Sequence, residues 1–254
     1  MKLTFVPLLQ VQRDLYELPR DMTRFRAYIR TMADPATHDL KYPLVAMNPM
    51  GREHVPALLD EWMALGADEI AGRAVAEAEL RLPAVPGEFR VGLVIADDLK
   101  GHWTNRYDYE FGHRFASRPF HRRGWLTGML STSESPSASA AGEAAGASVY
   151  RAAYIEQHGY ARTLREMLAQ ESYAMSGAGC TTPILDADDM AYTRAAMEPH
   201  LEATDKPTLV TCLFGDEAGA TLGYPRLGFS ERAGLARALA DAAPQRPSNT
   251  IPAR

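Results

Sequence analysis

One apolar run constrains the fold of this chain more than any other feature. It extends from Val91 to Ala96, with Pro86-Gly87 before it and Gly101 after it. A continuous apolar run bounded by turn residues is typical of a strand that is buried on both faces of a parallel sheet. The run ends in Asp97 and Asp98. Ligands of open α/β sheets lie beyond the carboxyl ends of the strands, so the run predicts a site at these aspartates.

Composition limits the class of protein. The chain has 254 residues, of which 46% are hydrophobic and 23% charged, as in a globular protein with a sizeable core. A net charge of -5 disfavours a general binder of nucleic acid or anionic membranes. Two cysteines are too few for a disulfide framework. No signal peptide or stretch of about 18 apolar residues is found. We therefore expect a cytoplasmic protein that binds neither nucleic acid nor membrane.

The order of the expected elements indicates an α/β fold. Besides the central run, three segments have the length and apolar character of strands: Tyr42–Met47, Trp125–Leu130 and Pro207–Phe214. Helical patterns separate them, which is typical of a parallel sheet with helices on its faces. Residues 135–148, rich in Ser, Ala and Gly, fit either a flexible loop or the weak start of a helix.

We expect one three-layer α/β domain over residues 1–242, with a mainly parallel sheet of at least four strands flanked by helices. Residues 1–40 would form an N-terminal helical extension. Residues 243–254 contain three prolines and little apolar content, so we expect a poorly ordered tail. The sequence does not indicate an oligomeric state.

If the expected strands are parallel, the loops that follow them meet at one edge of the sheet. Such a rim would gather carboxylates, which raise one another's pKa unless a cation compensates. Carboxylate and imidazole groups suit a divalent metal, and a metal-bound water can act as a nucleophile. A divalent metal is therefore the cofactor that we consider, with these speculative ligands: Asp97, Asp98, His102, Asp216 and Glu217. The alternative is that the acids cap the amino ends of helices.

The same loops supply candidates for catalysis and substrate binding. Asp97, Asp98 and His102 would be the central polar groups, and either His54 or His113 would transfer a proton. In the loop 100–106, Trp103 could stack against a ligand. Asn105 and Arg106 could fix a carboxylate or phosphate, with Arg52 as a further anion-binding residue. Alternatively, Arg106 pairs only with the nearby aspartates.

These patterns favour a small-molecule enzyme with an acidic and histidine-containing site, and in its metal-dependent form a hydrolase or lyase. An alternative is a non-catalytic binding or scaffold protein that uses a basic N-terminal helix and the loop 223–228. A weaker alternative is phosphate or nucleotide binding at Ser176–Gly179, which resembles part of a glycine-rich loop but follows a helical pattern. Neither a P-loop motif nor a GxSxG motif is present.

Overall fold

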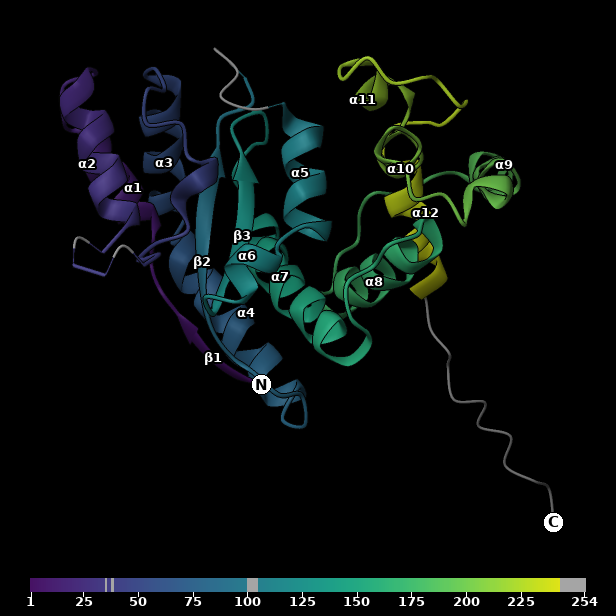
Figure 1. Ribbon diagram of the computed structural model, residues 1–254, viewed down its shortest axis with the longest axis horizontal. Coiled ribbons are helices and arrows are strands. Elements are labelled where there is room, and N and C mark those ends of the chain that lie inside the picture. Colours follow the sequence, from purple (N-terminus) through teal and green to yellow (C-terminus); the bar gives the residue numbers. More distant parts are fainter. Residues whose placement is uncertain (35, 38, 100–104, 243–254) are drawn as a thin grey trace.

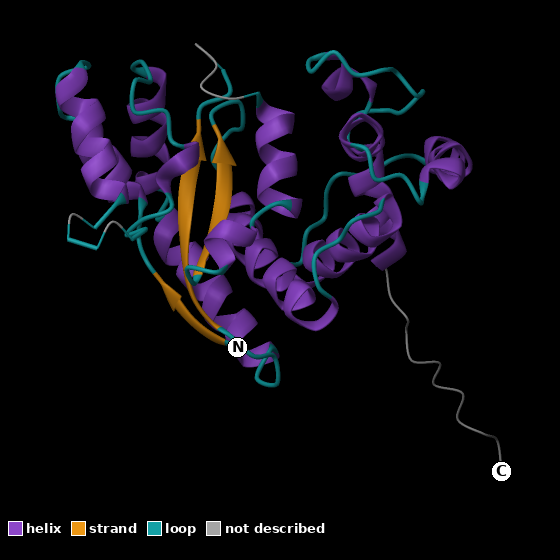
Figure 2. Cartoon of the chain, viewed as in Figure 1, coloured by secondary structure: helices purple, strands orange, loops and turns teal. Residues whose placement is uncertain are grey.

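A three-stranded parallel sheet forms the centre of the amino-terminal half of the molecule (Figure 2). The computed structural model describes residues 1–34, 36–37, 39–99 and 105–242. Strands β1 (Lys2–Phe5), β2 (Glu88–Ala96) and β3 (Trp125–Ser131) lie in the order β1-β2-β3. β2 pairs with β1 from Lys2↔Glu88 to Phe5↔Val91 and with β3 from Arg90↔Trp125 to Ala96↔Ser131. The central position of β2 explains its apolar run, which is buried throughout.

The prediction of a sheet with at least four strands is wrong. Residues Tyr42–Met47 contain the short 3-10 helix η1 (Leu44–Ala46), and Pro207–Phe214 lies in helix α10 (Lys206–Phe214). Asp205 caps α10 by accepting a hydrogen bond from the Thr208 amide at 3.0 Å. Every residue from 209 to 214 is buried, so this short helix is apolar on all sides and has no 3.6-residue pattern to distinguish it from a strand.

Helices cover both faces of the sheet. Helices α4 (Ala67–Arg81) and α7 (Ala138–His158) contact one face. Helix α1 (Leu9–Tyr16) contacts β2 on the other face, and α3 (His54–Ala64) packs on α1, which also contacts α2 (Met22–Met32). Glycines allow both approaches: a Cβ atom on Gly92 would lie 2.5 Å from Leu8, and one on Gly128 would lie 2.8 Å from the backbone of α7.

The side chain of Gln12 completes the edge of β2 where β1 ends. The last backbone hydrogen bond between these two segments joins the Val6 amide to the Val91 carbonyl. Beyond it, Gln12 is fully buried and accepts a hydrogen bond from the Ile95 amide while donating one to the Leu93 carbonyl, both at 2.9 Å. The buried polar groups of β2 therefore keep partners although β1 is short. No strand was predicted at β1, whose few residues carry little pattern.

The remaining helices form a second cluster beside the sheet. Helices α5 (Arg106–Phe115) and α6 (Arg118–His121) precede β3. The later helices are α8 (Leu164–Gly177), α9 (Ala187–Met197), η2 (Glu198–His200), α10, α11 (Asp216–Ala220) and α12 (Ala233–Ala242). Their apolar residues, with Phe115 of α5, make a hydrophobic cluster separate from that around the sheet. In Figure 1, α8–α12 lie on one side and the sheet on the other, with α5 and α7 between them.

The structure leaves two predictions about the chain as a whole untested. The single domain over residues 1–242 stays a prediction, and the tail expected at residues 243–254 lies outside the described residues. Among the helices that the structure describes, none is long and apolar enough to cross a membrane.

Candidate functional site

A cavity of about 570 Å³ lies between the two hydrophobic clusters. Its volume is in the range of small-molecule sites in proteins, which is roughly 300–1,000 Å³. Ala96 and Asp98 reach it from the end of β2, and Met129 and Ser131 reach it from β3. Four arginines and four acids also line it: Arg106, Arg114, Arg151, Arg232, Asp98, Glu110, Glu134 and Glu143. The acidic and basic side chains that line the cavity are therefore equal in number.

Helix α5 contributes one full face to this cavity. Asn105 begins the helix by accepting hydrogen bonds from the amides of Tyr107 at 2.9 Å and Asp108 at 3.2 Å. Residues three, four and seven positions apart on a helix share a face. That spacing brings these residues of α5 to the cavity: Arg106, Tyr109, Glu110, His113 and Arg114. Asn105 was predicted to bind substrate; the structure shows it as the cap that positions this face.

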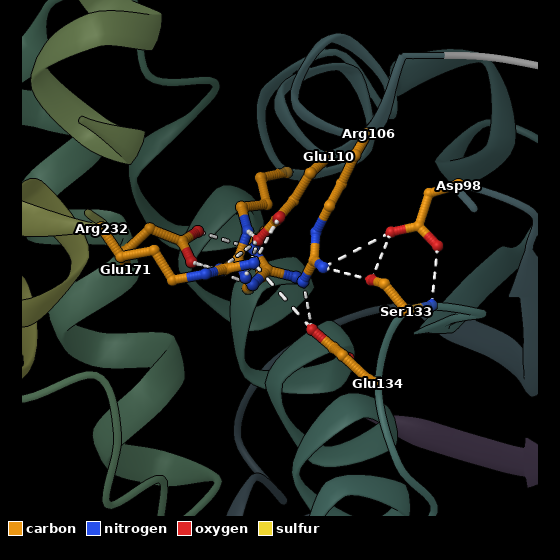
Figure 3. A network of polar contacts seen from close by, with 9 residues as sticks. Asp98, Arg106, Glu110, Ser133, Glu134, Glu171 and Arg232 are labelled. Atoms are coloured by element: carbon orange, nitrogen blue, oxygen red, sulfur yellow. Dashed lines mark hydrogen bonds and ion pairs between the residues drawn. The ribbon is translucent and has the colours of Figure 1, made fainter. Parts of the chain in front are cut away.

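Arg106 is held at the carboxyl end of the sheet by three oxygen-bearing side chains (Figure 3). Its Nη1 atom lies 2.5 Å from the Ser133 hydroxyl and 3.4 Å from Asp98 Oδ2, and Nη2 donates to the Glu134 carboxylate. Burial lowers the pKa of Arg106, but the carboxylates around it outweigh that effect and raise the pKa. Its positive charge is therefore permanent.

Arg232 reaches the cavity from the start of α12. Its guanidinium forms two hydrogen bonds of 3.0 Å with the two carboxylate oxygens of Glu110. Arg114 donates to the same carboxylate at 2.6 and 3.0 Å. Burial would raise the pKa of Glu110, but Arg114 and Arg232 hold it well below its usual range. The Nη2 atom of Arg232 also lies 4.0 Å from Glu134 Oε1, so the Glu134 carboxylate lies between Arg106 and Arg232.

A second carboxylate lies behind the cavity wall. Glu171 of α8 is fully buried and accepts hydrogen bonds from Arg151 of α7 at 2.7 and 3.0 Å and from Arg114 of α5. Burial raises the pKa of Glu171, but these two arginines outweigh it and lower the pKa to about 2. The ionised Glu171 therefore ties three helices together at one point.

His113 faces the same cavity as an uncharged side chain. Its Nδ1 atom lies 3.3 Å from the Thr127 hydroxyl, and its ring stacks on Tyr109. Burial, followed by the charges of Arg151 and Arg114, lowers the pKa of His113 to about 3. At neutral pH this imidazole therefore offers hydrogen bonds but no charge.

Asp97 and His54 contact each other directly but are not among the described residues that line the cavity. Asp97 is buried and accepts hydrogen bonds from His54 Nε2 and Asn48 Nδ2, each at 2.8 Å, and from Thr132 at 3.2 Å. Burial raises the pKa of Asp97, but the hydrogen bonds from His54 and Asn48 outweigh it, so the pKa is lowered. The pair joins the first residue of α3 to the end of β2.

The structure does not bring Asp216 and Glu217 to the predicted rim, because the segment before them is α10 and not a strand. Asp216 accepts hydrogen bonds from the amides of residues 227–229, and Glu217 pairs with Arg226 at 2.8 Å. Helix α11, which contains both acids, lies apart from the ends of β2 and β3 (Figure 1). These two side chains stabilise a local loop.

The other predicted site residues fall into three groups. Asp98, Arg106 and His113 line the cavity. Arg52 is exposed in the loop before α3. His102 and Trp103 lie outside the described residues. Among the residues that are described, no group of three or more His, Cys, Asp or Glu side chains is arranged to hold a metal.

Sequence reasoning missed several charged residues of the cavity. Arg151 lies in the apolar stretch Val149–Ile155, and Glu171 lies between Leu168 and Met175. A lone charge within an apolar helical segment is a usable signal, because such a charge is rarely buried without a partner. Arg114 and Arg232 carried no comparable signal. The Ser176–Gly179 segment ends α8, and the amides of Gly179 and Cys180 donate to helix carbonyls of Ser176 and Met175.

Comparison with known proteins adds no family to this description. No family model, curated protein or solved structure matches the chain. The charged residues of the cavity are therefore the main evidence for its function.

Proposed function

We propose that this chain binds a small carboxylate-bearing molecule in the cavity, with Arg106 and Arg232 as the residues that hold the carboxylate. The observation that carries this proposal is the position of Glu134, whose carboxylate contacts Arg106 and lies 4.0 Å from Arg232. The Glu134 side chain is 44% exposed, so it can leave at small cost. A ligand carboxylate could then take the place of the Glu134 carboxylate between the two arginines.

The backbone at Arg232 supports a role in ligand binding. Its φ angle is 54°, in the left-handed region that costs a non-glycine residue roughly 1–2 kcal/mol. The conformation is held by the Arg232 amide, which donates to the Phe214 carbonyl at 2.9 Å. Strained residues of this kind cluster at ligand sites, where the surrounding structure over-determines them. Here the strain directs a guanidinium group into the cavity.

The charge balance favours a carboxylate over a phosphate. Four acids line the cavity with the four arginines, so the site offers little excess positive charge. A carboxylate brings one negative charge and fits the planar fork of a guanidinium group, whereas a phosphate monoester brings almost two. The ligand expected is therefore a monoanion at this position.

Thermal-shift titration with pentanoate and with inorganic phosphate tests the proposal. We expect pentanoate to raise the melting temperature of the wild-type protein in a concentration-dependent way, because it binds only the folded state. Arg106→Gln and Arg232→Gly should abolish the shift, and glycine accepts the left-handed backbone at 232 without strain. Arg165→Gln serves as the control, because Arg165 is exposed and pairs with Glu202 outside the cavity. The proposal is wrong if pentanoate gives no shift, if phosphate alone gives one, or if all three variants respond alike.

Catalysis in this cavity is a second proposal, which the uncharged imidazole of His113 supports. It faces the space where the ligand would lie, and burial together with the nearby arginines lowers its pKa, so the ring is free to accept a proton at neutral pH. His113 could then accept a proton from the substrate in a lyase-type reaction. For a carboxylate that binds, His113→Asn should keep binding and stop its conversion as followed by NMR. A bound carboxylate that the wild-type protein leaves unchanged would restrict the function to binding.

A further inference from the structure

Glu143 differs from the other acids that line the cavity. Asp98 and Glu134 contact Arg106, and Glu110 contacts Arg114 and Arg232. Glu143, on helix α7, forms no ion pair with any residue that the structure describes, although it is only half-exposed. It is a carboxylate that faces the cavity without a matching positive charge.

The surroundings of Glu143 do not supply that charge. Its neighbour is the thiol of Cys180, whose pKa is raised to about 12 by burial and by the Glu143 carboxylate, so the thiol stays neutral. Arg114 and Arg151, which line the same cavity, are both bound to the fully buried Glu171. Cys180 gives Glu143 a neutral hydrogen-bond partner, and a ligand cation is the remaining source of a positive charge for this partly buried carboxylate.

We infer that the ligand of this cavity is a zwitterion, with its carboxylate held by Arg106 and Arg232 and a cationic amine held by Glu143. This inference rests on the proposed function and specifies its substrate class. It follows from two charged poles in one cavity. One pole is Arg106 and Arg232, which both lie near the displaceable side chain of Glu134 while Arg232 also holds Glu110; the other is an acid whose positive partner is missing among the described residues.

The wall between the two poles suits an aliphatic spacer. Helix α7 runs along the cavity with Ala140, Glu143, Ala144 and Ala147 facing it, and Glu134 lies in the loop before the helix. Methyl groups of alanine and the side chain of Met129 line the space. An amino acid whose charged groups are joined by a short methylene chain fits this arrangement.

The test compares amino acids with carboxylic acids of the same length by calorimetric titration of the whole protein. The probes are glycine, 3-aminopropanoate, 4-aminobutanoate and 5-aminopentanoate, each beside the acid that lacks its amine. At the length that fits, the amino acid should bind at least about tenfold more tightly, as expected for one additional charge-assisted hydrogen bond. Glu143→Gln should remove this preference, because an amide carries no negative charge to hold the amine.

The outcomes separate this inference from the proposed function. If plain acids bind and Arg106→Gln abolishes their binding, but no amino acid binds more tightly than its matched acid, the zwitterion inference is wrong and the carboxylate site stands. The inference is also wrong if Glu143→Gln keeps the preference for the amino acid. If neither acids nor amino acids bind, both proposals fail. The comparison within the wild-type protein decides the matter even if a variant folds poorly.

Discussion

At the scale of single residues, two histidines are held neutral by the fold. Burial and nearby arginines lower the pKa of His113 to about 3 and that of His121 to about 4. His121 keeps its ring nitrogens near the hydroxyl groups of Ser117 and Tyr160, each at 3.2 Å. In the unfolded chain both would titrate near 6.5. Between these values the unfolded state binds more protons, so acid favours unfolding.

We therefore predict that the free energy of unfolding falls as the pH is lowered from 7 to 5. The contribution of His113 is fully present above pH 6.5 and is lost as the pH falls toward 3. For His113 alone the loss by pH 5 should be about 1–2 kcal/mol. Urea denaturation at several pH values measures it, and His113→Asn should show a shallower dependence than the wild-type protein.

Other groups do not obscure this comparison. Burial raises the pKa of Asp68 to about 6, which gives the opposite sign in the same range, but Asp68 is present in both proteins and cancels. The lowered pKa values of Glu110 and Glu171 take effect only below their ordinary values, outside the window. Equal slopes in the wild-type protein and in His113→Asn would contradict the prediction.

Residue-level chemistry could be predicted where it follows a recognisable strand end. Asp98 was predicted from the end of β2, and Arg106 from the loop that follows it. Arg232 and Glu143 could not be predicted, because each reaches the cavity through a helix whose neighbours depend on tertiary packing. The sequence gives the type of each side chain, but it does not show which side chain lies opposite it across a cavity.

At the scale of elements, the contact between β3 and α7 depends on small residues. The Ser, Ala and Gly stretch at 135–148 was expected to be a flexible loop or the weak start of a helix; most of it is the first part of α7. Ser137 caps this helix by accepting a hydrogen bond from the Ala140 amide at 3.1 Å. Ala141 and Ala145 are fully buried, and their size lets the helix approach the strand closely.

We predict that Gly128→Ala destabilises the protein by about 1–3 kcal/mol. The added Cβ atom would lie 2.8 Å from the Ala145 nitrogen, and this backbone cannot move without shifting α7. Gly112→Ala is the matched control: apart from its chain neighbours and the nearby backbone of α5, no atom of the described residues lies within 4 Å of its Cβ position. Alanine favours a helix over glycine by about 1 kcal/mol. The urea concentration at the midpoint of unfolding should fall for Gly128→Ala and rise for Gly112→Ala. Equal stability of Gly128→Ala and the wild-type protein would contradict the packing argument.

The misassigned elements show where periodicity fails. The segment Pro207–Phe214 has the length and composition of a buried strand, and a helix that is buried on all sides looks the same in sequence. Only two signals indicate a helix there: Asp205 as the N-cap residue, and Pro207 in the first turn. Capping residues are thus more informative than hydrophobicity for short buried elements.

At the scale of the whole molecule, an ion pair beside the cavity joins the two hydrophobic clusters: Glu171 on α8 is bound by Arg151 of α7. A second pair, between Glu110 on α5 and Arg232 just before α12, holds the helical cluster together. The sequence predicted a site at the end of β2 but placed it within one sheet. Periodicity shows that a helix has an apolar face without showing which other face it meets. The helical cluster that closes the cavity was therefore beyond sequence reasoning.

Because this network is buried, removing one charge from it should weaken the connection between the clusters. Glu171→Gln would leave Arg114 and Arg151 without their shared carboxylate in a buried place, at a cost of about 3–5 kcal/mol. Glu202→Gln is the control, because Glu202 forms a pair with Arg165 in which both side chains are more than half exposed, and its loss should cost less than about 1 kcal/mol.

Amide hydrogen exchange distinguishes a loss of connection from a uniform loss of stability. In Glu171→Gln, exchange should increase in α8 and α12 more than in β2, because the sheet keeps its own hydrophobic cluster while the helical cluster loses its anchor. An equal increase of the exchange rate in all elements would mean that the two clusters unfold together and that the ion pairs do not connect two separately stable parts. No change in α8 would mean that Arg114 and Arg151 find other partners. The proposed ligand site uses Arg106 and Arg232, whereas Glu171 is bound by Arg114 and Arg151, so a ligand that displaces Glu134 should leave this connection intact.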